Sequence, residues 1–112
     1  MSDQKLEAKI EKAAAKKKSG PIVKVLAKAD EEVLVKALTA LGDIGDEDSR
    51  NNITHYLDHE NKQVRLAACR AGIKIGTDYM NTRVRHQLAM EKDPEVKQEI
   101  QKILNDAKKA YE

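Results

Sequence analysis

The spacing of apolar residues along this chain predicts helices from one end to the other. In seven segments the apolar positions recur every three to four residues, and no segment alternates with the period of two that a strand requires. The predicted helices span residues 3–18, 21–28, 31–42, 49–59, 62–75, 79–91 and 94–110. The pattern therefore indicates an all-α fold.

The breaks between these segments carry the residues that start and stop helices. Ser19, Gly20 and Pro21 end the first helix, and proline suits the first turn of the next one. Asp93 followed by Pro94 is typical of a helix start, because a capping carboxylate precedes a residue that needs no backbone donor.

An internal repeat organises the chain. The stretch Ala29–Gly45 returns as Glu60–Gly76, so that Val33 matches Val64 at a separation of 31 residues. A repeat of this length is typical of a helical solenoid, in which each unit packs only on its neighbours. The expected fold is an α–α superhelix of about three helix pairs plus a C-terminal capping helix.

By length the chain is one domain, residues 1–112. We expect residues 1–20 to form a basic N-terminal capping helix, residues 21–92 to contain the repeats and residues 93–112 to form the C-terminal capping helix. Each terminal segment carries apolar residues on one side only, as the end of a solenoid should.

The second helices of the pairs align at the same spacing. Six aligned positions should be buried: Ile22, Leu26, Ile53, Leu57, Val84 and Leu88. The positions two residues after the first of each pair point about 200° away, at about 100° per residue. These positions, with those one turn further on and a neighbouring arginine, should form one exposed basic strip: Lys24, Lys28, His55, His59, Arg85 and His86.

The unit NKQVRLAACRAGIKIG, residues 61–76, resembles the HEAT-like repeat of phycobilisome lyases and of many small bacterial scaffold proteins. LGDIGD, residues 41–46, is similar to the other half of that consensus, and the resemblance covers about residues 21–110. It implies antiparallel helix pairs whose second helices line a concave face. The function that it implies is non-catalytic protein–protein binding by a small adaptor or scaffold.

The predicted strip has two interpretations. A mildly basic surface with histidines would favour an acidic partner protein, the more so at low pH, because histidine gains charge near neutral pH. An ordinary solvated helix face carries such residues as well.

Nucleic-acid binding is the alternative function, through Lys24, Arg83, Arg85 and the first helix. The net charge of +2 is too small to argue for it, and the distribution of charge matters more. Residues 1–20 carry six lysines and three acids, net +3, whereas the remaining 15 bases and 16 acids sum to −1.

An enzyme, such as a lyase or a metal-dependent hydroxylase subunit, is a weaker alternative. The repeat resembles that of deoxyhypusine hydroxylase, an iron enzyme whose His-Glu pairs follow the Val-Arg position. Here Leu66 and Ala67 follow it, which argues against that activity. His55 and His59 stand four residues apart and could share one side of a helix, but no third ligand is evident. We therefore expect no catalytic residue, no cofactor and no metal.

The remaining expectations concern the environment of the chain. Cys69 is the single cysteine, so no disulfide framework exists, and its place in a helical pattern predicts a packed, unreactive thiol. No apolar run approaches the ~18 residues of a membrane span. We expect a cytoplasmic protein without a membrane partner and favour a monomer.

Overall fold

The computed structural model describes residues 3–110, and within this range the chain forms seven helices and no strand. Their bounds are α1 Asp3–Ala15, α2 Ser19–Leu26, α3 Glu31–Ile44, α4 Glu47–Tyr56, α5 Lys62–Ile75, α6 Asp78–Met90 and α7 Pro94–Lys109. The all-α prediction is confirmed.

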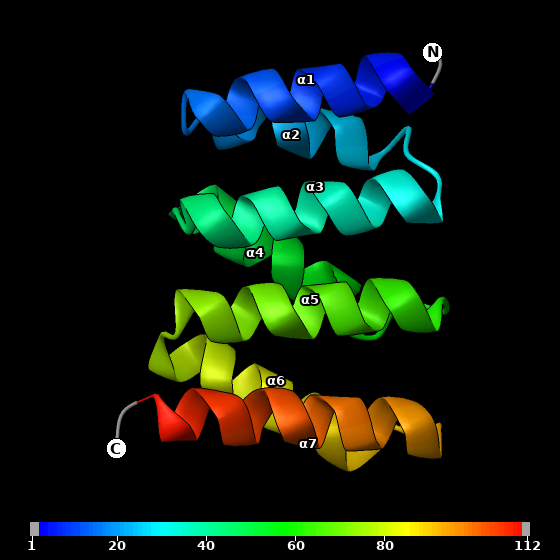
Figure 1. Ribbon diagram of the computed structural model, residues 1–112, viewed down its shortest axis with the longest axis vertical. Coiled ribbons are helices and arrows are strands. Elements are labelled where there is room, and N and C mark those ends of the chain that lie inside the picture. The colour runs from blue at the N-terminus through cyan, green and yellow to red at the C-terminus, as the bar shows by residue number, and fades with distance from the viewer. Residues whose placement is uncertain (1–2, 111–112) are drawn as a thin grey trace.

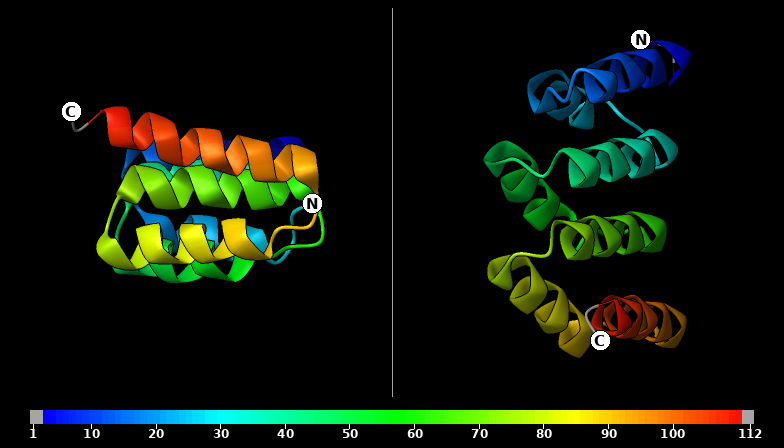
Figure 2. Two further views of the ribbon diagram at one scale, coloured as in Figure 1. Left: turned by 90° about the horizontal axis from the view of Figure 1, so that it is seen from below. Right: turned by 60° about the vertical axis from the view of Figure 1, so that its left-hand side comes forward.

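The helices form two layers, as the repeat predicts (Figure 1). The first helices of the pairs, α1, α3 and α5, lie side by side and are followed by α7, while α2, α4 and α6 form the second layer. Figure 2 shows the two layers from two further sides, with the second layer below the first in the left view and to its left in the right view. The result is a slab of 37 × 28 × 19 Å with an α–α superhelical path.

The core lies between the two layers, and the predicted repeat register places its residues correctly. Ile22, Ile53 and Val84 are fully buried at equivalent places on α2, α4 and α6. Leu26 and Leu57 are buried too, but Leu88 is only half-buried, so that prediction is wrong. Besides α4, α6 contacts only α5 and α7 among the described helices. Among residues 3–110 no further second helix packs on its outer side, which leaves Leu88 partly exposed.

Glycines set the end of α3 and its distance from α5. The predicted end at Gly42 is wrong, because the helix runs to Ile44 and is terminated by Gly45 in the left-handed region, with φ of 68°. Gly42 instead lies inside the helix against Ala71, where an added Cβ would come within 2.8 Å of the Ala71 Cα. Its missing side chain therefore lets the first-helix layer pack closely at this point.

The other helix ends follow their capping residues. Five helices begin after a residue whose side chain accepts a hydrogen bond from a backbone N–H of the first turn, namely Asp30, Asp46, Asn61, Thr77 and Asp93. Because Asp46 is a cap, α4 starts two residues before the predicted position, and it ends three residues early, at Tyr56.

The start of α2 is fixed by a contact between repeats. Ser19, predicted to lie in a turn, is buried as the first residue of α2 and donates a hydrogen bond of 2.7 Å to Asp46. This hydrogen bond is the main cause that lowers the pKa of Asp46.

Tyr111, which the sequence places on the apolar stripe of the last helix, lies outside the described residues.

Candidate functional site

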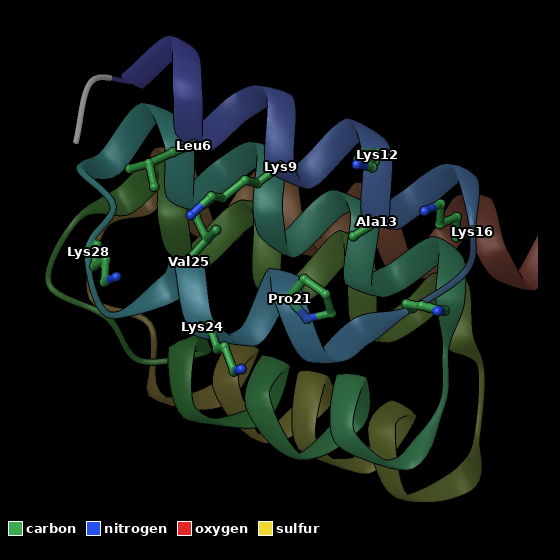
Figure 3. A pocket seen from close by; sticks show the side chains of 10 residues that line it. Leu6, Lys9, Lys12, Ala13, Lys16, Pro21, Lys24, Val25 and Lys28 are labelled. Atoms are coloured by element: carbon green, nitrogen blue, oxygen red, sulfur yellow. The ribbon is translucent and has the colours of Figure 1, made fainter.

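A groove of about 390 Å³ lies between α1 and α2 at the N-terminal end of the array (Figure 3). Its rims are basic and its floor is apolar. The lining residues are Leu6, Lys9, Lys12, Ala13, Lys16, Lys18, Pro21, Lys24, Val25 and Lys28. Six of these ten described residues are lysines and none is acidic, so the groove is a concentrated positive site.

The basic and acidic residues of α1 lie on two different edges of the helix. At about 100° per residue its three lysines, Lys5, Lys9 and Lys12, fall within an arc of about 60°. Lys16, directly after the helix, continues the same spacing. The buried stripe of Leu6, Ile10 and Ala13 lies next to them. The acids Glu7 and Glu11 fall beyond that stripe, and Glu7 pairs with Lys36 of α3 at 2.9 Å. The acidic edge of α1 therefore faces the array and the lysine edge faces the groove.

The turn between α1 and α2 brings further lysines to the groove. Lys17 takes the left-handed conformation, with φ of 55°, and the N–H of Lys18 reaches back to the carbonyl of Ala13 at 2.9 Å. This turn sets Lys16 and Lys18 at the same end of the groove. Lys18 is also the N-cap of α2, its side chain makes no capping hydrogen bond, and the first turn of that helix contains no acidic residue.

Two predicted strip residues lie in the groove and two others lie in a second hollow. Lys24 and Lys28 line the opposite rim from the α1 lysines. His59 and His86 line a hollow of about 490 Å³ between the turn before α5 and the end of α6. Arg83 lines that hollow as well, and its Nε is buried without a hydrogen-bond partner among the described residues.

His59 does not extend the exposed face of α4, because the helix ends at Tyr56. The His59 Nδ1 accepts a hydrogen bond of 3.0 Å from the backbone N–H of Asn61, and its ring stacks on Tyr56 at 5.9 Å between ring centroids. The expected alignment of His55 and His59 on one side of a helix is therefore wrong.

The remaining strip residues lie apart. His55 is exposed on α4 and lines neither hollow. Arg85, expected beside His86, lines a different hollow of about 580 Å³ between α6 and α7. The structure thus divides the predicted strip among several places and adds four lysines that the strip did not include, Lys9, Lys12, Lys16 and Lys18.

A family model described as HEAT repeats matches residues 20–108. The chain belongs to the HEAT-repeat family. No curated protein and no solved structure matches it. HEAT repeats typically serve as protein-interaction scaffolds and are generally non-catalytic.

Cys69 of this HEAT-repeat protein is buried inside α5. Burial raises the pKa of the Cys69 thiol to about 12, so the nucleophilic thiolate is strongly disfavoured. Across residues 3–110 no cluster of three or more His, Cys, Asp and Glu side chains could hold a metal ion. In the same range no helix has the length and apolar character to cross a bilayer.

Proposed function

We propose that this HEAT-repeat protein is a non-catalytic binding module that docks an acidic partner protein at the N-terminal end of its array. The observation that carries the proposal is the groove between α1 and α2, with six lysines and no acid among its described lining residues. His55 and His86 are exposed on α4 and α6, outside this groove.

Electrostatics supports an acidic partner over a neutral one. Ammonium groups gathered around one groove repel each other, and a carboxylate placed among them removes part of that repulsion. Such a field also speeds the encounter with a negatively charged protein, by an amount that falls as salt is added. The proposed docking is therefore salt-sensitive.

Nucleic acid is less well supported as the partner. The arginines proposed for that function, Arg83 and Arg85, line hollows other than the lysine groove, so the bases do not form one continuous track. Single strands also favour aromatic side chains for stacking, and Tyr56 and Tyr79 belong to α4 and α6, away from the groove.

We propose that this chain shares its repeat units with the phycobilisome lyases and does not share their catalytic activity. A lyase or hydroxylase needs a reactive group at a surface site, and the thiol of Cys69 is buried inside α5. An adaptor function asks only for a surface of matched shape and charge, which the groove supplies.

Affinity capture with matched variants tests this function. The groove variant Lys12→Glu, Lys24→Glu changes one lysine on each rim, and the control variant Lys97→Glu, Lys102→Glu changes two exposed lysines of α7. Both variants shift the net charge from +2 to −2. Each protein is used to capture partners from extract of the source cells, with and without nuclease treatment.

The expected result is an acidic protein retained by the wild type and by the control, and lost from the groove variant. Capture by the groove variant at the wild-type level would contradict the proposal. Capture that disappears after nuclease treatment would favour the nucleic-acid alternative.

A further inference from the structure

The other two helix pairs of the array have corresponding grooves, and a helix of the same chain packs against each of them. The groove of the pair α3 and α4 is covered by α2, which contacts both helices. The groove of the pair α5 and α6 is covered in the same way by α4. Among residues 3–110, no helix covers the corresponding side of the pair α1 and α2, where the lysines lie.

From this relationship we propose that the partner docks through an acidic amphipathic helix, which takes the place that α2 and α4 take on the internal pairs. This inference rests on the proposed function and specifies the docking segment. The helix presents one or two apolar side chains to the groove and carries carboxylates on both flanks of that apolar stripe.

The walls of the groove favour a ligand with an apolar face. Leu6, Ala13 and Val25 are buried at its floor, and the ring of Pro21 is exposed along it. The four-carbon stems of the lysines add apolar surface below their charged ends. A wholly charged ligand would leave these surfaces in water, whereas an apolar side chain would cover them.

The size of the groove leads to the same conclusion. Its volume of about 390 Å³ lies at the lower end of the range of roughly 300–1,000 Å³ that holds drug-sized ligands. A single phosphate or carboxylate group would fill a small part of it. One or two leucine-sized side chains from a docked helix fill it better.

The rims supply the charge pattern that the flanks of such a helix must match. Lys9 and Lys12 on α1 and Lys16 directly after its end follow each other at three and four residues, and seven residues of helical rise correspond to about 10 Å between the outer two. Glutamates three or four residues apart on a partner helix repeat at the same rise. The second rim, on and around α2, offers Lys24 and Lys28 to the other flank.

A second copy of this chain is a poorer occupant. In a head-to-tail contact the groove would meet the other end of the array, where the hollow between α6 and α7 carries Arg85 and Lys108. No acid is among the described residues that line that hollow. Like charges facing each other across a contact disfavour it, so the partner helix comes from a different protein.

Three probes of equal net charge separate the possible ligands. The first is a capped peptide with leucines at positions i, i+4 and i+7 and glutamates on both flanks. The second is the same peptide with each leucine replaced by serine, and the third is a single-stranded oligonucleotide. Each probe is titrated into the ¹⁵N-labelled full chain at low salt, and amide shifts report the affinity and the location of binding.

We expect the leucine peptide to bind at least tenfold more tightly than the serine peptide, with shifts centred on α1 and α2. The Lys12→Glu, Lys24→Glu variant should lose this binding, and the Lys97→Glu, Lys102→Glu control should keep it. Equal binding of the two peptides in the groove would overturn the amphipathic helix while leaving an acidic partner in place. Failure of both peptides, shifts away from α1 and α2, or tighter binding of the oligonucleotide would overturn both proposals.

Discussion

Arg65 and Glu91 form a two-pronged ion pair that ties the start of α5 to the residue after α6. The Arg65 Nε and Nη2 each lie 3.0 Å from a different carboxylate oxygen of Glu91, and the Glu91 side chain is only 3% exposed. Arg65 also donates to the carbonyl oxygens of His59 and Glu60 at 2.9 Å. One side chain therefore holds together the turn before α5 and the turn before α7.

The change Glu91→Gln should lower the free energy of unfolding at pH 7 by about 2–3 kcal/mol, because Arg65 loses its charged acceptor while it stays largely covered. Chemical denaturation of both proteins measures this. Glu60→Gln is the matched control, since Glu60 stands 31 residues earlier and is exposed. The control should change stability by less than about 0.5 kcal/mol.

The same pair predicts the acid sensitivity of the fold. Burial raises the pKa of Glu91, but hydrogen bonds from Arg65, Gln87 and the Asp93 backbone, with the charge of Arg65, lower it below its usual 4.5 overall. A folded-state pKa below the unfolded value gives stability that is present above about pH 4.5 and lost as the pH falls. The Glu91→Gln variant should lose less stability than the wild type between pH 5 and 3, and parallel losses would contradict this account.

Leu57→Ala should destabilise the fold by roughly 2–4 kcal/mol, the cost of emptying a core leucine. Leu57 is 2% exposed, near the middle of the array. Leu88→Ala, at the equivalent position of α6, should cost less because Leu88 is only half-buried. Chemical denaturation measures both, and a loss below about 0.5 kcal/mol for Leu57→Ala would show that the core is misassigned.

Lys17→Gly should stabilise the protein by about 0.5–1 kcal/mol, because Lys17 has a φ of 55° that glycine adopts without strain. Lys17 is outside the groove lining, so peptide binding should change little. Thermal unfolding gives the stability, and a lower melting temperature would mean that the lysine side chain contributes more than its backbone costs.

The repeat allowed most of the fold to be predicted, because burial at one place in the array implies burial 31 residues away. Ile22, Ile53 and Val84 follow this rule. Leu88 breaks it because its burial depends on which helix comes next, and the periodicity of its own segment does not contain that information.

Helix ends were less predictable because they depend on packing. Gly42 has the appearance of a helix stop in the sequence, but its function is to let α3 approach Ala71 of α5. Lys17 adopts a backbone conformation that residue type does not favour, and Ser19 is drawn into α2 by its hydrogen bond to Asp46. Neither these two contacts nor the conformation of Lys17 leaves a periodic signal in the sequence.

The groove could have been found in part from sequence. The angular grouping of Lys9, Lys12 and Lys16 on one edge of a helix follows from their spacing alone. That Lys24 and Lys28 lie across from them depends on the turn at Lys17, which only the structure shows. The predicted strip included Lys24 and Lys28 and left out Lys9, Lys12 and Lys16.

Site-specific photo-cross-linking tests the docking of an acidic partner at the α1–α2 groove most directly. A photoreactive amino acid replaces Pro21, which lines the groove, or, as a control, Gln98, which is exposed on α7. Mass spectrometry then identifies the cross-linked segment in cell extract. The account predicts cross-links from position 21, and not from position 98, to a carboxylate-rich segment of another protein. Cross-links from position 21 to nucleic acid, or partner cross-links from position 98 alone, would contradict it.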